Sequence, residues 1–162
     1  MTYTIEKVTT LIGAHRFGAT DANIGFLLTD SRSLCFAEET LFFALKSGRG
    51  DGHAYIPDLY RRGVKNFVVE DVPADYDTAY PDANFLKVES SLVALQRLAE
   101  RHREEYDIPI VGITGSNGKT IVKEWLYQLL SPELKVTRSP RSYNSQIGVV
   151  STAMSGWIMP LR

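Results

Sequence analysis

The sequence predicts an α/β fold in which a small domain with a mixed sheet is followed by the start of a second domain. Short apolar, β-branched runs alternate along the chain with segments whose apolar residues recur at helical spacing. Late in the chain, a glycine-rich turn that ends in Gly-Lys-Thr stands between one such run and one such helix. The order of strand, glycine-rich turn and helix is the context that a phosphate-binding loop requires.

The first 106 residues hold a complete set of predicted strands and helices. A helix is expected over 5–12 because its apolar residues follow helical spacing, and Gly13 is placed to end it. A longer helix is expected from Leu92 to about Tyr106, with its charged residues on a solvated face. The other expected elements are strands at 26–29, 40–45, 66–70 and 84–88, a short helix at 55–62 closed by Gly63, and loops at 46–53 and 72–81.

The second unit opens with a predicted buried strand at 108–111, and a helix is expected to begin near Lys119. Gly115 and Gly118 let the backbone turn with positive φ and leave no Cβ in the way of a ligand. Successive N–H groups and the start of the helix can then hold an anion. The candidate ATP-binding residues are Gly115, Ser116, Asn117, Gly118, Lys119 and Thr120.

Two of these residues are also the candidate catalytic residues. Lys119 would bring a positive charge to the β- and γ-phosphates of ATP, and Thr120 would bring a hydroxyl to Mg²⁺. The general loop pattern has four residues between its first glycine and Gly-Lys, whereas five residues separate Gly112 from Gly118. The generic signature is therefore not met, and a glycine-rich turn without a ligand is the alternative.

The variant loop Gly-Ile-Thr-Gly-Ser-Asn-Gly-Lys-Thr, at 112–120, resembles the ATP loop of the Mur ligase family. Mur ligases are the ATP-dependent amino-acid and dipeptide ligases of peptidoglycan synthesis. Folylpolyglutamate and cyanophycin synthetases carry related loops. The loop alone therefore indicates an ATP-driven amide-bond ligase without specifying its substrate.

A second signal is Asp30-Ser31-Arg32, directly after a predicted strand. A serine and an arginine at a strand end can hold a phosphate or a carboxylate, although Asp-Ser-Arg is equally a helix cap or a turn. The element resembles one in the amino-terminal domain of two Mur ligase branches, those that add the third residue and those that add D-alanyl-D-alanine. The resemblance implies that Ser31 and Arg32 bind the UDP end of the substrate.

Residues 41–46 and 51–56 resemble the family run Leu-Phe-x-Ala-Leu-x-Gly followed by Asp-Gly-His-x-Phe, in order and in spacing. Ser47 stands where the family usually has glycine, and Tyr55 replaces another aromatic residue. The resemblance puts His53 within reach of substrate; a histidine satisfied by loop backbone is the alternative. His15 and His102 lie outside any motif and are expected to be structural or solvent-facing.

A third signal, at 142–149, follows a predicted strand at 135–137 and resembles the Asn-Asn-x-Ile-Gly-Val stretch of the D-alanyl-D-alanine-adding branch. Asn144 is the candidate for a contact with substrate or with a Mg²⁺-bound water, and a turn residue is the alternative. The Thr-Thr-Pro element of the tripeptide-forming branch is not found. The resemblance ends at about residue 149, and 150–162 do not follow it.

Composition excludes several classes of function. The net charge of −1 gives no electrostatic case for nucleic acid as a partner. No apolar run is long enough for membrane insertion, and the first residues do not have the pattern of a signal peptide. Cys35 is the single cysteine, so an internal disulfide is excluded and a cytoplasmic setting is the simpler interpretation. No cluster has the spacing of zinc ligands.

These signals together predict a UDP-substrate-binding domain at 1–106 and the beginning of a central P-loop ATPase domain at 107–162. The 56 residues from 107 onward are too few for a parallel ATPase sheet, so we expect a fragment of a longer protein, inactive by itself. The resemblance implies that D-alanyl-D-alanine is added to UDP-N-acetylmuramoyl-tripeptide through an acyl phosphate, with ATP and Mg²⁺. The alternatives are the tripeptide-forming branch and a non-catalytic module that binds a UDP-sugar or a nucleotide.

Overall fold

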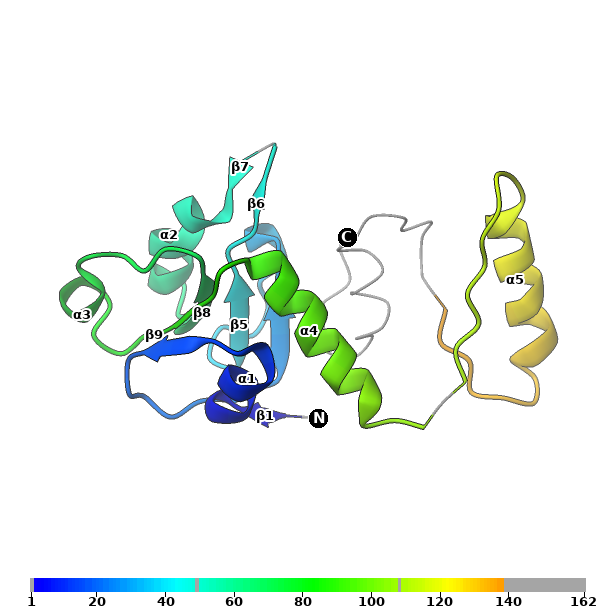
Figure 1. The fold of residues 1–162 in the computed structure, drawn as a ribbon, viewed down its shortest axis with the longest axis horizontal. Helices are drawn as coiled ribbons and strands as arrows, with labels where there is room; N and C mark the ends of the chain where they lie inside the picture. The colour runs from blue at the N-terminus through cyan, green and yellow to red at the C-terminus, as the bar shows by residue number, and fades with distance from the viewer. Residues whose placement is uncertain (1, 49, 108, 139–162) are drawn as a thin grey trace.

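The fold is built on a five-stranded mixed sheet with the strand order β2-β9-β8-β5-β4 (Figure 1). The computed structural model describes residues 2–48, 50–107 and 109–138. Neighbouring strands β4, β5, β8 and β9 are parallel, whereas β2 runs antiparallel to β9. The strands are β2 (His15–Phe17), β4 (Phe26–Leu28), β5 (Thr40–Phe43), β8 (Asn66–Val69) and β9 (Asn84–Lys87). The predicted α/β class and mixed sheet are confirmed.

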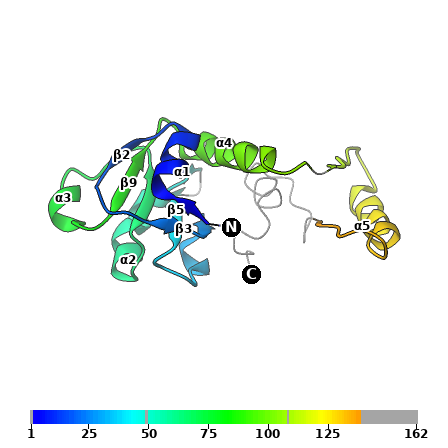
Figure 2. The same ribbon diagram turned by 90° about the horizontal axis from the view of Figure 1, so that it is seen from below.

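Helices cover both faces of this sheet (Figure 2). On one face, α1 (Ile5–Ile12) packs with α4 (Ser91–Glu104), and apolar residues of both join a core with Leu41 and Phe43 of β5. On the other face, Phe42 packs with residues of α2 (Ile56–Arg61). All residues of β5 and β8 are buried, which explains why these strands appear in the sequence as continuous apolar runs.

The helix ends follow local chemistry that the sequence already carries. The Thr4 hydroxyl accepts a hydrogen bond from the Lys7 N–H at 3.3 Å and caps the start of α1. Gly13 ends this helix in the left-handed conformation, with φ of 65°. Gly63, with φ of 95°, follows α2. The predicted helices at 5–12 and 55–62, and the long helix from Leu92, are confirmed within a few residues at their ends.

Two segments expected to be loops contain regular structure. The segment 46–53 holds a hairpin of β6 (Lys46–Ser47) and β7 (Gly50–Asp51), and then the 3-10 helix η2 (Gly52–Tyr55). The segment 72–81 holds α3 (Tyr76–Ala79), because Tyr76 and Tyr80 pack edge-on against Phe85 of the sheet. Four short elements were also not predicted: β1 (Tyr3–Thr4), the edge strand β2, β3 (Asn23–Ile24) and the 3-10 helix η1 (Ser31–Ser33).

After residue 107, the structure differs more from what the sequence predicted. Helix α5 (Lys119–Leu130) is confirmed, but it lies apart from the sheet in Figure 1 and none of its residues is buried. The predicted strands at 108–111 and 135–137 are wrong, because 109–111 and 135–137 have no regular structure and Val111 is 68% exposed. A strand needs a neighbour for its backbone hydrogen bonds, and no described residue pairs with either segment. The domain boundary near residue 107 stays a prediction.

Among the described residues, none of the helices combines the length and apolar character needed to cross a bilayer. In the same part of the chain, no group of three or more His, Cys, Asp and Glu side chains is arranged to hold a metal ion.

A polar cluster that includes the buried side chains of Tyr3 and His102 ties the amino-terminal residues to the end of α4. The Tyr3 hydroxyl donates to the Glu105 carboxylate and lies 3.1 Å from Nδ1 of His102. The Lys7 ammonium lies 2.7 Å from the other Glu105 oxygen and 4.0 Å from the centre of the Tyr3 ring. Burial, followed by the hydrogen bond to Glu105, raises the pKa of Tyr3. His102 therefore has a structural role, which is one of the two roles expected from the sequence.

We expect Tyr3→Phe to lower the free energy of unfolding by about 1–3 kcal/mol, because it removes the hydroxyl that is hydrogen-bonded to buried His102 and to Glu105. The matched control is Tyr60→Phe, since the exposed Tyr60 hydroxyl donates to Asp82 and Lys65 lies over its ring at 3.9 Å. That exposed cluster should contribute less than about 1 kcal/mol. Urea denaturation of both variants measures the difference, and equal losses would contradict the special role of the Tyr3 cluster.

Candidate substrate edge and phosphate loop

The parallel strands bring three sequence segments to one edge of the sheet. Residues 30–32 follow β4, Lys46 follows β5, and Glu70 and Asp71 follow β8. In open α/β sheets, ligands bind in the crevice beyond the carboxyl ends of the strands. We call this region, formed by residues 30–32, 46–48, 50–55 and 70–71, the carboxyl edge.

The Asp30-Ser31-Arg32 turn holds its arginine by a two-pronged contact. The Asp30 carboxylate caps η1 by accepting the Arg32 N–H at 3.0 Å, and it receives Nε and Nη2 of the guanidinium at 2.9 and 2.6 Å. The hydrogen bond from the Arg32 side chain is the largest cause that lowers the pKa of Asp30. The Arg32 side chain nevertheless stays 88% exposed, so it is oriented and still open to a ligand.

The turn is also tied to the neighbouring helix α2. Arg62, at the end of α2, donates from Nη1 to the Ser31 carbonyl at 2.8 Å. The pKa of Arg32 is raised mainly by its hydrogen bond to Asp30, and to a smaller extent by the nearby hydroxyl of Tyr55. Because β4 and β5 are neighbours in the sheet, the two predicted substrate motifs follow adjacent strands.

The geometry gives each residue of Asp51-Gly52-His53 a separate task. Asp51 accepts the His53 N–H at 2.9 Å and begins η2. Gly52 packs against the end of β5, where an added Cβ would lie 2.7 Å from the Leu45 nitrogen and 2.9 Å from the Ala44 backbone. A side chain at position 52 would therefore separate the hairpin from the sheet. With the turn in this place, the His53 ring reaches the end of β8.

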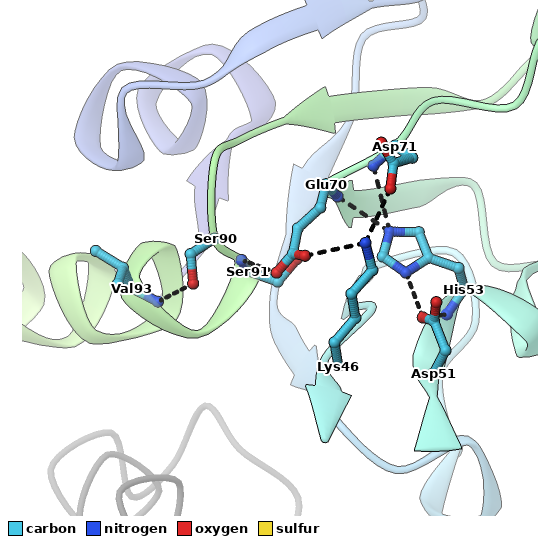
Figure 3. Close-up of polar contacts among 8 residues, drawn as sticks. All are labelled: Lys46, Asp51, His53, Glu70, Asp71, Ser90, Ser91 and Val93. Carbon is cyan, nitrogen blue, oxygen red and sulfur yellow. Dashed lines mark hydrogen bonds and ion pairs between the residues drawn. The ribbon is translucent and has the colours of Figure 1, made fainter. Parts of the chain in front are cut away.

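Both ring nitrogens of His53 have protein partners (Figure 3). Nδ1 lies 2.5 Å from the Asp51 carboxylate, and Nε2 accepts the Glu70 N–H at 3.0 Å. Because Nε2 accepts, the proton of the neutral ring sits on Nδ1 and is donated to Asp51. This is the histidine satisfied by loop backbone that the sequence left as an alternative. A direct contact of His53 with substrate stays a prediction.

Lys46 and Glu70 belong to the carboxyl edge but were missed in the sequence. The Lys46 ammonium lies 2.8 Å from the Asp71 carboxylate and 3.2 Å from that of Glu70, and hydrogen bonds to Asp71 and then to Glu70 raise the pKa of Lys46. The other Glu70 oxygen accepts the Ser91 N–H at the start of α4, at 3.0 Å. An open hollow of about 450 Å³ lies beside these groups, with β9 residues Lys87 to Glu89 along it. The available signal was a charged residue at the end of a predicted strand or directly after it, Glu70 in the first case and Lys46 in the second.

The glycine-rich loop has the backbone conformation that its sequence requires. Gly115 and Gly118 have φ of 142° and 77°, values that other residues rarely adopt. An added Cβ at Gly118 would meet no atom within 4 Å, so the requirement for glycine at this position is conformational. The first hydrogen bond of α5 joins the Val122 N–H to the Gly118 carbonyl at 3.0 Å. The loop therefore ends at the amino terminus of a twelve-residue helix.

Lys119 folds back over this loop. Its ammonium donates to the Gly115 carbonyl and lies 3.4 Å from the Ser116 carbonyl. Glycines with positive φ, a cation above the loop and a helix amino terminus together fit a phosphate group. Thr120 is in the first turn of α5, next to Lys119, while Asn117 precedes the left-handed glycine. Asn144 lies outside the described residues.

Comparison with known proteins connects both regions to one family, although no protein-family model matches the chain. A UDP-N-acetylmuramoyl-tripeptide–D-alanyl-D-alanine ligase of Synechocystis sp. is 40% identical over 134 residues, which are 83% of this chain and 28% of the relative. The ligase of the same name from Bacillus subtilis is 32% identical over 129 residues, 78% of this chain and 27% of the relative. A UDP-N-acetylmuramoyl-L-alanyl-D-glutamate–2,6-diaminopimelate ligase of Cytophaga hutchinsonii is 33% identical over 69% of this chain and 23% of the relative.

Solved structures agree with this result. MurF from Acinetobacter baumannii has a TM-score of 0.82 at 24% identity, covers 98% of this chain and 35% of its own, and supports the fold alone. MurF ligase from Thermotoga maritima, in complex with ADP, has a TM-score of 0.67 at 30% identity and covers 79% of this chain and 28% of its own.

The chain belongs to the Mur ligase family, whose members are ATP-dependent amide-bond ligases. Within the family it is most like the ligases that add D-alanyl-D-alanine to UDP-N-acetylmuramoyl-tripeptide, which confirms the resemblance seen in the sequence. The chain spans 28% and 27% of the length of the first two relatives.

Gly52→Ala should lower the free energy of unfolding by about 1–3 kcal/mol, because the new Cβ would overlap backbone atoms that cannot move independently. Gly50→Ala, in the same hairpin, is the control, since a Cβ there would meet nothing within 4 Å. Chemical denaturation of both variants tests this expectation. A Gly52→Ala variant as stable as Gly50→Ala would show that the hairpin does not depend on close packing against β5.

Proposed function

We propose that this chain forms the UDP-substrate-binding domain and the beginning of the ATP-binding domain of a ligase that adds D-alanyl-D-alanine to UDP-N-acetylmuramoyl-tripeptide. The observation that carries the proposal is the 40% identity, over 134 residues, to a ligase of that specificity. The division at residues 106 and 107 and a cytoplasmic location are part of the proposal. The geometry suggests which task falls to each region.

The carboxyl edge would hold the UDP end of the substrate. The exposed Arg32 fork can bind a phosphate or a carboxylate through N–H groups that Asp30 does not occupy, and Ser31 lies next to it in the same turn. His53 lies in η2 of the same edge, and a contribution of this residue to substrate binding is part of the proposal. Arg62 would keep the turn in place by its bond to the Ser31 carbonyl. Asn144 is proposed as a further substrate contact on its sequence motif alone.

The loop from Gly115 to Thr120 would bind ATP. Lys119 would place its charge beside the β- and γ-phosphates, the loop N–H groups would hold the phosphate oxygens, and Thr120 would offer its hydroxyl to Mg²⁺. When bound, ATP supplies the phosphoryl group that activates the substrate carboxylate, and Mg²⁺ neutralises phosphate charge. The ADP complex of the Thermotoga maritima relative supports a nucleotide site in this family.

The alternative in the same family is the ligase that adds the third residue of the peptide. The 33% identity to the diaminopimelate ligase of Cytophaga hutchinsonii favours keeping this alternative. Turnover assays of the ligase that contains this chain separate the two. D-alanyl-D-alanine dependence with the UDP-tripeptide supports the proposal, and diaminopimelate dependence with the UDP-dipeptide overturns it.

Arg32→Ala should weaken the binding of UDP-N-acetylmuramoyl-tripeptide by roughly 1.5–3 kcal/mol, because a charge-assisted hydrogen bond to the ligand is lost. Arg61→Ala serves as the control, since Arg61 is 76% exposed, pairs with Asp58 in its own helix and has no described bond to the turn. Titration calorimetry on the 162-residue chain measures both affinities. Equal affinity of Arg32→Ala and the parent chain would remove Arg32 from the substrate site.

Lys119→Ala should abolish ATP-dependent phosphate release in the ligase that contains this chain, while the affinity for the UDP-substrate stays within about twofold. The charge of Lys119 matters most when the phosphoryl group is transferred. Thr120→Ala should cause a milder loss that added Mg²⁺ partly restores, because water can replace one hydroxyl ligand. Lys123→Ala, one turn later in α5, is the control. Normal turnover of Lys119→Ala would exclude the phosphate-loop assignment and favour a non-catalytic binding module.

A further inference from the structure

His53 sits where the loops after two parallel strands meet the start of a helix. Asp51 and His53 follow β5 through the β6–β7 hairpin, Glu70 follows β8, and Ser91 begins α4 (Figure 3). These elements are joined by a continuous series of hydrogen bonds: Asp51 to His53, His53 to Glu70, and Glu70 to Ser91. Lys46 joins this series at the Glu70 carboxylate.

The bonds in this series require a particular form of the ring. The Glu70 N–H points at Nε2, at 3.0 Å, and the Asp71 N–H lies 3.5 Å from the same atom. Nε2 can accept only while it carries no proton, so the ring must be neutral with its proton on Nδ1. Asp51 favours this tautomer, because its carboxylate accepts the Nδ1 proton. The hydrogen bonds from the backbone and side chain of His53 lower the pKa of Asp51, which keeps Asp51 an acceptor.

The backbone at position 70 determines where the Glu70 carboxylate lies. One carboxylate oxygen accepts the Ser91 N–H at the positive end of the α4 dipole, and the other lies 3.2 Å from the Lys46 ammonium. The Lys46 side chain is 42% exposed, whereas only 16% of the His53 side chain is exposed. Lys46 can therefore reach a ligand at the edge, while His53 is mostly covered and has partners on both nitrogens.

We propose that His53 is a positioning residue: it holds the Glu70 and Asp71 N–H groups on Nε2, and so fixes the carboxylates that orient Lys46 towards the substrate. The proposal rests on the proposed function in one respect, that the carboxyl edge binds the anionic UDP-substrate. In this arrangement His53 acts on the substrate through Glu70 and Lys46. The hydrogen bond at Nδ1 selects the tautomer of the His53 ring, and the hydrogen bond at Nε2 holds the Glu70 backbone in place.

Two substitutions separate the roles of the two ring nitrogens. The amide of glutamine can place an oxygen near the position of Nε2, whereas the shorter asparagine places its amide near Nδ1. His53→Gln should therefore keep the bond to the Glu70 N–H, and His53→Asn should lose it. Asp77→Asn is the control, because Asp77 is exposed on α3 and does not line the hollow beside Lys46 and Glu70.

The experiment combines amide exchange, imidazole ¹⁵N spectra and calorimetry with UDP-N-acetylmuramoyl-tripeptide, all on the 162-residue chain. In the parent chain, the ¹⁵N shifts should show a protonated Nδ1 and an unprotonated Nε2. In His53→Asn, exchange at Glu70 and the dissociation constant should each rise about tenfold, which is the expected effect of one lost hydrogen bond. His53→Gln should stay within about threefold of the parent chain in both measurements, and Asp77→Asn should match the parent chain.

Three results would overturn the proposal: a ring protonated on Nε2, an unchanged Glu70 exchange rate in His53→Asn, or a His53→Gln variant that keeps Glu70 protected but binds as weakly as His53→Asn. The last result would mean that the ring itself contacts the ligand. Protection of the β8 amides shows that each variant is folded. If the parent chain does not bind the UDP-substrate, the proposed function fails, while the exchange and ¹⁵N data still decide whether His53 positions Glu70.

Discussion

The parallel pairing of β5 with both of its neighbours is the constraint on which the rest of the structure depends. Leu41 of β5 lies opposite Leu27 on one side and Asn66 on the other. Because β5 is buried on both faces, a slip of one residue would exchange Phe42 with its neighbours between the two cores. The register is therefore fixed, and the parallel direction brings the ends of β4, β5 and β8 to one edge. Motifs that lie far apart in the sequence meet there as a consequence.

At this edge several contacts between segments join a side chain to a backbone atom. Gly52 permits a close approach to the backbone of β5, His53 accepts the Glu70 N–H, and Arg62 donates to the Ser31 carbonyl. Such bonds fix the path of a loop whatever the neighbouring side chain is, and they leave the exposed cations Arg32 and Lys46 oriented by carboxylates. Exposed ion pairs add little stability. Their consequence here is orientation, which is what recognition of an anionic substrate requires.

The sequence predicted the features that depend on local pattern or on buried strands, and missed those that depend on topology. Helix α1 carries its own cap and its left-handed glycine, so its ends could be predicted closely. Helix α3 could not, because it depends on the packing of Tyr76 and Tyr80 on Phe85 across the sheet. Lys46 and Glu70 were missed for the same reason. A charge after a strand becomes part of a site only when the strand order brings two such ends together.

The same contrast between local and non-local features is found within one short segment, the phosphate loop and the strand expected before it. The loop depends on φ at Gly115 and Gly118 and on the helix that follows, all of which are local, and the structure contains them without help from the sheet. A strand at 109–111 would need hydrogen-bond partners from another strand, and no described residue supplies them. The apolar residues Val111 and Trp125, each 68% exposed, belong to the non-local part. The chemistry of the phosphate site is thus encoded locally, whereas its support, like the whole carboxyl edge, depends on neighbours in space.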